Sequence, residues 1–118
     1  MMRALYVTSD LLFSSRVSQA ARQVGVELQL VASTEAALGE LVADETALVM
    51  LDLGSISTSL KEFVDNLRAR SESLTILAYG PHVDEDALAA ARSAGCDLVL
   101  TRGQFDREIK QILAELVA

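Results

Sequence analysis

Short apolar runs alternate with longer amphipathic segments along this chain. The apolar runs fall at residues 4–7, 28–31, 48–51, 75–78 and 98–100. Each run has the length of a strand rather than that of a buried helix. Strands that are apolar at nearly every position are typical of a parallel sheet that is covered on both faces. The pattern therefore predicts five buried strands.

Between and after these runs, apolar residues recur at helical spacing. The amphipathic segments are residues 14–24, 34–42, 60–70, 84–94 and 106–117. In the first of them, Val17, Ala20, Ala21 and Val24 stand at i, i+3, i+4 and i+7, so one stripe of the helix is apolar. The chain thus reads as a strand followed by a helix, five times over.

Residues at the ends of these segments support the same division. Thr34 and Asp84 stand where helix N-caps are expected. Gly25 and Gly95 follow the first and fourth helices, where a left-handed C-cap favours glycine. Five strand–helix units with right-handed crossovers form a parallel sheet with helices on both faces. We predict an α/β three-layer sandwich of the flavodoxin-like kind, with five helices and strand order 2-1-3-4-5.

Asp52 is the most informative residue, because it ends the most apolar of the runs. In open parallel sheets, ligands bind at the carboxyl ends of the strands, near the point where strand order reverses. In the predicted order that point lies between the first and third strands, so Thr8, Ser9 and Asp10 are expected beside Asp52. Gly54 follows Asp52 closely and is expected at the same pocket.

Composition narrows the functional classes. The 118 residues are enough for one domain with one core, and 51% of them are hydrophobic. The formal net charge of −7 argues against general binding to nucleic acids or membrane surfaces, which favour positive proteins. No apolar stretch approaches the ~20 residues of a membrane span, and no signal peptide is recognisable. With one cysteine and no metal-ligand cluster, we expect a cytoplasmic protein without a metal site.

Four stretches carry a resemblance to a known family. They are Leu5-Tyr6-Val7-Thr8-Ser9-Asp10, Val49-Met50-Leu51-Asp52-Leu53, Ile76-Leu77-Ala78-Tyr79-Gly80, and the segment from Ala94 to Phe105. The last contains Gly95-Cys96-Asp97 and Leu100-Thr101-Arg102, and it is similar to the family stretch GADDYLTKPF. Over nearly its whole length the chain resembles the CheY-like receiver domains of response regulators. The resemblance implies one receiver-like domain over residues 1–118, without an output domain.

The resemblance also implies a chemistry. In receivers, an aspartate at the position of Asp52 accepts a phosphoryl group from a histidine kinase. Two acidic residues after the first strand hold Mg²⁺, and a Ser or Thr after the fourth strand and a Lys after the fifth contact the phosphoryl group. The metal and the lysine offset the repulsion between a carboxylate and a phosphoryl group.

This sequence departs from that pattern at almost every supporting position. Thr8 and Ser9 replace the acidic pair, with Asp10 one position further on. Tyr79 takes the Ser/Thr position and must point away from the pocket or cap it, whereas the small Gly80 after it fits. Arg102 replaces the lysine. Two outcomes are open for Arg102: it could hold Asp52 in a bidentate pair, or it could remain free in solvent. In both cases one carboxylate and a few hydroxyls leave too few hard oxygens for Mg²⁺.

These departures predict a degenerate pseudo-receiver that acts in signalling by protein–protein contact, without catalytic residues of its own. Two alternatives remain open. One is a phosphorylatable receiver in a two-component phosphorelay, in which Asp52 is phosphorylated with Mg²⁺ as cofactor. The other is a flavodoxin-like module that binds a small ligand or a nucleotide at the switch point, where Thr8, Ser9, Ser55 and Ser57 could bind an anion.

The partner is expected to be a protein, either a histidine kinase, another regulator or a second copy of the chain. The fourth helix is rich in alanine, including Ala87 and Ala91, and small side chains permit close approach. Receivers often dimerise or dock through their fourth helix, fifth strand and fifth helix. On that face Arg92, Arg107 and Lys110 are expected to supply charges at the rim.

Overall fold

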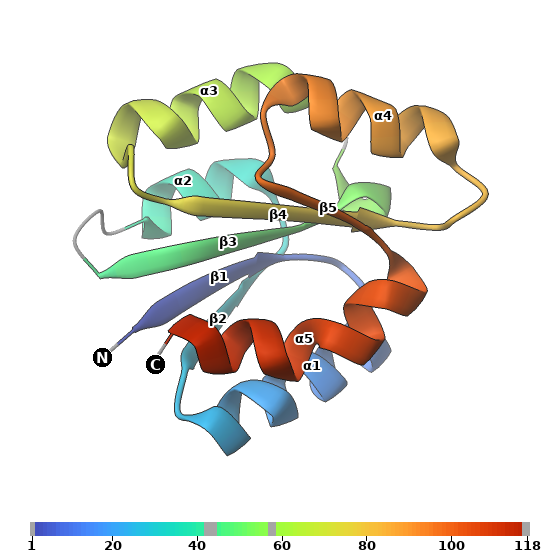
Figure 1. The fold of residues 1–118 in the computed structure, drawn as a ribbon. Helices are drawn as coiled ribbons and strands as arrows, with labels where there is room; N and C mark the ends of the chain where they lie inside the picture. The colour runs from blue at the N-terminus through green and yellow to red at the C-terminus, as the bar shows by residue number, and fades with distance from the viewer. Residues whose placement is uncertain (1, 42–44, 57–58, 117–118) are drawn as a thin grey trace.

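Five parallel strands form a single sheet in the order β2-β1-β3-β4-β5 (Figure 1). The computed structural model describes residues 2–41, 45–56 and 59–116. The strands are β1 Arg3–Val7, β2 Glu27–Val31, β3 Thr46–Asp52, β4 Thr75–Gly80 and β5 Leu98–Thr101. The helices are α1 Leu11–Val24, α2 Thr34–Glu40, α3 Leu60–Arg70, α4 Glu85–Ala94 and α5 Arg102–Leu116, with a short 3-10 turn η1 at Leu53–Ser55. The predicted fold class and strand order are confirmed.

The helices cover both faces of the sheet. Helices α1 and α5 lie on one face, and α2, α3 and α4 lie on the other (Figure 1). Successive strand residues alternate between the two layers: Tyr6 packs toward α1 and α5, whereas Leu5 and Val7 pack toward α2, α3 and α4. Because both faces are covered, the central strands are apolar at consecutive positions, as the sequence indicated.

The helix ends agree in part with the sequence. Asp84 caps α4 by accepting a hydrogen bond from the Ala87 N–H, as predicted. Gly25 and Gly95 take left-handed φ angles of 80° and 100° at the ends of α1 and α4, also as predicted. The prediction of Thr34 as an N-cap is wrong: Ser33 caps α2, and Thr34 is the first residue of that helix.

Two helices begin earlier than predicted. Helix α1 begins at Leu11 rather than residue 14, because the Asp10 carboxylate accepts from the Phe13 N–H and caps it. Helix α5 begins at Arg102 rather than residue 106. Thr101 and Gln104 form a capping box, in which each side chain accepts from the backbone N–H of the other, at 3.2 and 2.9 Å. The predicted ends of the second and fifth helices, at 42 and 117, lie outside the described residues.

In the described part of the chain, no helix combines the length and hydropathy that crossing a bilayer requires.

Candidate functional site

The candidate site is a cleft of about 250 Å³ at the carboxyl ends of the central strands. Asp52 ends β3 and pairs in register with Tyr79 of β4. The loop after β1 lies beside it, as the strand order predicted. The cleft is lined by Ser9, Asp10, Asp52, Gly54, Ser55, Tyr79, Gly80, Pro81 and Arg102.

The Asp52 carboxylate is held by three neutral donors. Thr8 and Ser55 both donate their hydroxyls to Oδ2, at 2.8 and 3.0 Å. The backbone N–H of Gly54 donates to Oδ1 at 3.1 Å, so Asp52 also caps the short turn η1. Both carboxylate oxygens therefore already accept hydrogen bonds from within the chain.

Ser9 joins the loops after β1 and β3. Its backbone N–H donates to the Ser55 hydroxyl at 3.0 Å, and the two hydroxyls lie 3.0 Å apart. Ser55 in turn donates to Asp52, so the hydroxyl hydrogen bonds in this cleft converge on the carboxylate. Thr8 and Ser55, with Ser9 bound to Ser55, thus satisfy an anion that the chain itself supplies, whereas Ser57 lies outside the described residues.

Asp10 has a separate set of partners. Its Oδ1 accepts from the Phe13 N–H at 3.0 Å, and its Oδ2 accepts from Arg102 Nη2 at 2.8 Å. The Phe13 N–H and then Arg102 hold the pKa of Asp10 below its ordinary value, against a smaller opposing effect of desolvation. The Arg102 guanidinium also lies 4.4 Å from the centre of the Phe13 ring, in a cation–π contact.

The predicted pair between Arg102 and Asp52 is wrong. Because the capping box starts α5 at Arg102 itself, the arginine side chain leaves from the first residue of the helix and reaches Asp10 at the start of α1. Asp52 receives only the neutral donors described above. Of the two outcomes left open for Arg102, pairing with Asp52 or free in solvent, the structure shows neither.

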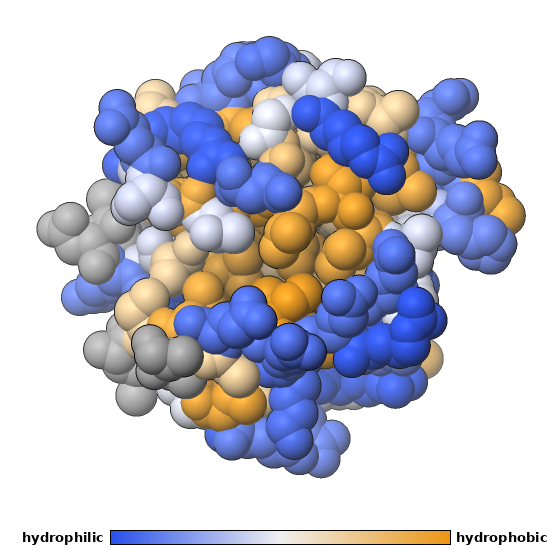
Figure 2. All heavy atoms as spheres, in the orientation of Figure 1, coloured by the Kyte–Doolittle hydropathy of each residue, from blue (hydrophilic) through white to orange (hydrophobic). Residues whose placement is uncertain are grey.

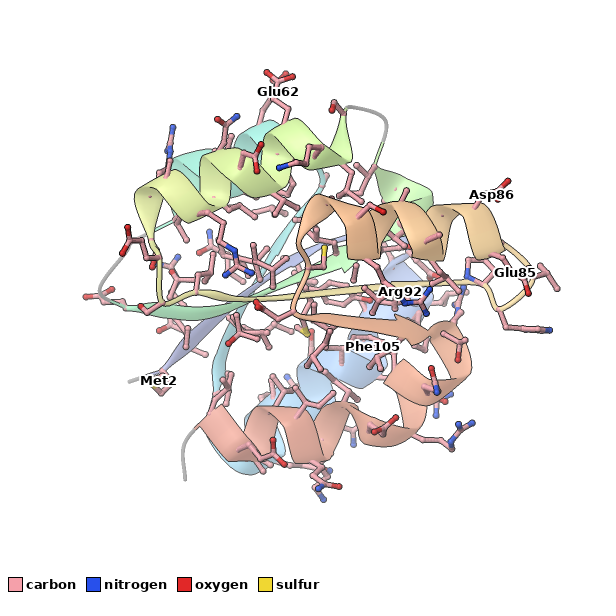
Figure 3. All side chains as sticks on the ribbon, turned by 45° about the horizontal axis from the view of Figure 1, so that its top comes forward. Met2, Glu62, Glu85, Asp86, Arg92 and Phe105 are labelled. Atoms are coloured by element: carbon pink, nitrogen blue, oxygen red, sulfur yellow. The ribbon has the colours of Figure 1, made fainter. Side chains whose placement is uncertain are left out.

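Tyr79 points its phenol away from the cleft into the core under α1 and α5. Its ring stacks on Phe105 at 4.2 Å between centres and an 8° angle between planes, and its hydroxyl lies 2.5 Å from that of Tyr6. Figure 3 shows Phe105 between α5 and the sheet. Burial raises the pKa of Tyr6 to about 12, and burial together with the Tyr6 contact raises the pKa of Tyr79. The Thr8 hydroxyl, which donates to Asp52, opposes these shifts and lowers the pKa of both phenols to a smaller extent.

The donor set fits Mg²⁺ poorly. Magnesium needs several hard oxygen ligands in octahedral geometry. Asp52 and Asp10 are the carboxylates that line the cleft, and all four of their oxygens accept hydrogen bonds from Thr8, Ser55, Gly54, Phe13 or Arg102. Among the described residues, no group of three or more His, Cys, Asp or Glu side chains is arranged to hold a metal. We derive no metal-dependent step for this site.

Two glycines bring backbone close to the cleft. A Cβ at Gly54 would lie 3.4 Å from Asp52 Oδ1, and a Cβ at Gly80 would lie 3.4 Å from Leu53 Cδ1. Both positions are thus compact, and both glycines line the cleft. Cys96 is half-buried away from this cleft, and burial raises the pKa of its thiol to about 11, which keeps it protonated and unreactive.

The predicted interface residues divide into two groups. Ala91 lies on the side of α4 that faces the sheet and is completely buried. Its prediction as a residue that contacts a partner is therefore wrong, because it packs the helix onto its own sheet. Ala87 is half-buried, and Arg92, Arg107 and Lys110 are exposed. Figure 3 shows Arg92 on α4, with the acidic Glu85 and Asp86 at the other end of that helix.

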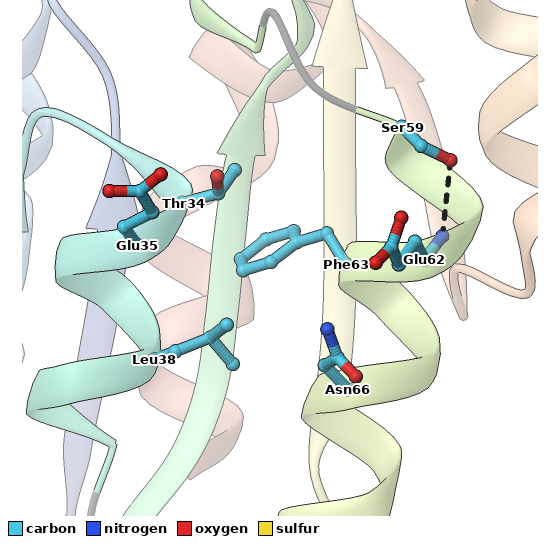
Figure 4. A pocket seen from close by; sticks show the side chains of 7 residues that line it. All are labelled: Thr34, Glu35, Leu38, Ser59, Glu62, Phe63 and Asn66. Carbon is cyan, nitrogen blue, oxygen red and sulfur yellow. Dashed lines mark hydrogen bonds between the residues drawn. The ribbon is translucent and has the colours of Figure 1, made fainter.

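A second cleft, of about 200 Å³, lies between α2 and α3 (Figure 4). Glu35 and Glu62 are its charged lining residues, and the ring of Phe63 and the side chain of Leu38 form its apolar part. The Ser59 hydroxyl in this cleft accepts from the Glu62 N–H and caps α3. The Ser59 hydroxyl thus serves the start of α3, and the cleft does not include Asp52.

Sequence reasoning missed several residues that build the site. Phe13 supports Arg102, and the Thr101–Gln104 box sets where Arg102 points. The spacing Thr-x-x-Gln before an amphipathic segment is a recognisable helix-start signal that could have found that box. Tyr6 carried no such signal, because it is one of several consecutive apolar strand residues.

Comparison with solved structures identifies the fold. A receiver domain of a response regulator from Bermanella marisrubri is 19% identical, with a TM-score of 0.79 over 98% of each chain. A CheY-like protein (tadZ) from Pseudomonas aeruginosa PAO1 is 20% identical, with a TM-score of 0.75 over 98% of this chain and 99% of its own. HP1043, an orphan response regulator of H. pylori, is 19% identical, with a TM-score of 0.72 over 98% of this chain and 93% of its own.

The chain therefore has the CheY-like receiver fold. No family model and no curated protein matches its sequence. At these identities the likeness concerns the fold, and the site must be argued from its own residues.

Proposed function

We propose that this chain is a pseudo-receiver: a regulatory module that acts by protein–protein contact and does not pass phosphoryl groups through Asp52 with Mg²⁺. The receiver fold of the solved neighbours supports the regulatory setting. The observation that carries the rest is that both oxygens of Asp52 are already bound by Thr8, Ser55 and Gly54.

The electrostatics of phosphoryl transfer support the proposal. A carboxylate that attacks a phosphoryl group needs cations to offset the charge that gathers in the transition state. Arg102 is the cation that lines the Asp52 cleft, and it pairs with Asp10. The hydroxyls of Thr8 and Ser55 stabilise Asp52 as a ground-state anion, which lowers its tendency to attack.

Intact mass after incubation with acetyl phosphate and Mg²⁺ tests the proposal. We expect the mass to stay unchanged, while a working receiver in the same tube gains one phosphoryl group of about 80 Da. The Asp52→Asn variant controls for modification elsewhere. A stoichiometric adduct on the wild type that is missing from this variant would instead establish the phosphorelay alternative.

The face formed by α4, β5 and α5 is the surface we propose for a regulator or a second copy of the chain. Apolar side chains gather over the middle of this face, between rims of polar ones (Figure 2). Leu98 at the edge strand is 38% exposed, and Val99, Leu100 and Ile112 are half-buried. Light scattering with wild type and Leu98→Asp tests this. A dimer that becomes monomeric in the variant supports a second copy, and a monomer in both favours a different partner.

A further inference from the structure

A further cleft, distinct from the one between α2 and α3, adjoins the Asp52 site and differs from it in charge. It measures about 470 Å³ and lies between the start of α1, the loop after β4 and the start of α5. Its lining residues are Phe13, Arg16, Pro81, His82, Arg102, Gly103 and Asp106. Arg102 and Pro81 belong to both clefts, so the two share a wall.

Two arginines line this cleft, and a third lies beside it. The Arg102 guanidinium lies over the Phe13 ring and donates a hydrogen bond to Asp10. Half of the Arg102 side chain remains exposed. Arg16 pairs with Asp106 at 3.1 Å and is 67% exposed. Each of these guanidiniums has five N–H donors, so each retains donors for a further acceptor.

Arg107 supplies the third guanidinium. A Cβ at Gly103 would lie 3.5 Å from Arg107 Nη1, so this side chain folds back over the first turn of α5 and lies beside Gly103, which lines the cleft. In the part of the chain that the structure describes, Arg107 forms no ion pair. Three of the ten lysines and arginines thus lie at one corner of a molecule whose net charge is −7.

This charge favours a carboxylate as the ligand. Three guanidiniums outnumber Asp10 and Asp106, so the corner is locally positive, and guanidinium groups bind carboxylates through two parallel hydrogen bonds. A polyanion such as a nucleic acid is disfavoured, because the rest of the chain repels it.

Apolar side chains at the rim favour a protein segment over a small free acid. Leu12 is 88% exposed, one helical turn before Arg16 on the same side of α1. Val83 is 77% exposed and follows His82 in the loop after β4. Large apolar side chains this exposed beside a charged cleft are typical of surfaces that bind other proteins.

We propose that this cleft docks an acidic segment of a partner protein, with a carboxylate bound by Arg16, Arg102 and Arg107 and apolar neighbours resting on Leu12 and Val83. The inference goes beyond the proposed function, because it names a second surface and the chemistry of its partner. It does not depend on whether Asp52 is phosphorylated.

Selection from a random peptide display library against the immobilised full chain tests the docking proposal. We expect enrichment of peptides with an Asp or Glu flanked by Leu, Ile, Val or Phe. A synthetic peptide of the most enriched sequence should bind at least about tenfold more weakly to Arg16→Gln/Arg107→Gln than to the wild type, and its own Glu→Gln or Asp→Asn version should lose a similar factor. Arg22→Gln, in the last turn of α1, removes the same kind of charge elsewhere and should bind the peptide like the wild type.

Each other outcome overturns the proposal. Enriched peptides without acidic residues, or equal binding to the wild type and to Arg16→Gln/Arg107→Gln, would place recognition elsewhere. Inorganic phosphate or an oligonucleotide that displaces the peptide and binds more tightly would make the ligand a phosphate. A dimer in light scattering that Arg16→Gln/Arg107→Gln dissociates would make the occupant a second copy. Circular dichroism and the thermal midpoint verify that the variants fold, and mass analysis with acetyl phosphate tests the proposed function separately.

Discussion

Arg102 donates to Asp10 across 2.8 Å, from the first residue of α5 to the residue that caps α1. The pair joins two helices that lie on the same face of the sheet. The pair also determines which groups surround Asp52, because Arg102, a predicted partner of Asp52, binds Asp10 instead. Asp52 is left with hydroxyl and backbone donors from its own and the neighbouring loop.

The capping box at the start of α5 predicts a measurable contribution to stability. Replacing Thr101 by Val removes the hydroxyl that accepts from the Gln104 N–H while keeping the side-chain shape. We expect the free energy of unfolding in urea to fall by about 1 kcal/mol, the usual effect of losing an N-cap. Because the box also sets the direction of Arg102, the same variant should weaken the contact between Arg102 and Asp10.

Thr75→Val is the matched control for this substitution. Thr75 lies in β4, and among the described residues its hydroxyl makes no hydrogen bond. We expect its free energy of unfolding to stay within about 0.5 kcal/mol of the wild type. Equal changes for both variants would mean that the box contributes nothing beyond the general effect of Thr→Val.

The buried phenols of Tyr6 and Tyr79 predict a strong coupling. Tyr79→Phe removes one partner of a buried hydrogen bond and takes from the Tyr6 hydroxyl its hydrogen-bond partner among the described residues. We expect a loss of about 1–3 kcal/mol, the effect of an unsatisfied buried polar group. The double variant Tyr6→Phe/Tyr79→Phe should lose less than the sum of the two single variants. Simple additivity in this double-mutant cycle, measured by urea unfolding, would contradict the coupling.

The same pair predicts how stability depends on alkaline pH. Burial raises the pKa of Tyr6 from 10 to about 12, so above pH 10 the unfolded chain loses protons that the folded chain keeps. The stabilisation is therefore complete below pH 10 and is lost as pH rises toward 12, with a slope of up to about 1.4 kcal/mol per pH unit for each tyrosine. The curve for Tyr6→Phe/Tyr79→Phe should be flatter. Both should be measured in a Cys96→Ala background, because the raised pKa of that thiol acts in an overlapping range.

Hydrophobic patterning predicted the fold well, because burial on both faces of the sheet leaves a strong signal in consecutive strand residues. The strands, the strand order and the place of Thr8 beside Asp52 followed from it, and the glycines after the first and fourth helices indicated the left-handed C-caps. The helix starts at Leu11 and Arg102 did not, since they depend on side-chain caps rather than on an apolar stripe.

The ion-pair partners of the charged residues were harder to predict, because they depend on differences of a few ångströms in where neighbouring side chains lie. Topology brings Asp10, Asp52 and Arg102 to one end of the sheet, and pattern alone does not decide which carboxylate the arginine reaches. Similarly, an alanine-rich helix fits both close packing on its own sheet and close approach of a partner. Ala91 proved to serve the first purpose.

The Asp97 carboxylate leads us to expect that the protein becomes less stable in acid. Its carboxylate accepts from Arg68 and from the Ile76 N–H, both at 2.7 Å, and so connects α3 and β4 to the start of β5. Partial burial raises its pKa, but the Ile76 N–H and Arg68 together outweigh this and hold the pKa below its ordinary value. The folded chain thus binds fewer protons than the unfolded chain near pH 4, and this stabilisation is lost as pH falls.

Asp97→Asn should therefore unfold more easily than the wild type at pH 7, by roughly 1 kcal/mol because the group is partly screened by solvent. The difference should shrink in acid, as the wild-type carboxylate becomes protonated. Asp65→Asn, which removes an exposed pair with Lys61, should change stability by no more than about 0.5 kcal/mol. A difference for Asp97→Asn that stays constant from pH 7 to pH 3 would show that charge is not its source.

Acidic residues at the positions of Thr8 and Ser9 should create a metal site beside Asp52. In Thr8→Asp/Ser9→Asp, two carboxylates would join Asp52 at the carboxyl ends of β1 and β3, where Thr8 now donates to it. Without metal, the like charges should lower the thermal midpoint below that of the wild type. With Mg²⁺ in large excess over its dissociation constant, the midpoint should recover by several degrees, because binding to the folded state alone adds a few kcal/mol. Thr8→Asn/Ser9→Asn, which has the same shape without charge, should show no such response. If the wild type itself gains as much from Mg²⁺ as the acidic variant does, then its cleft already holds the ion, and the pseudo-receiver proposal fails.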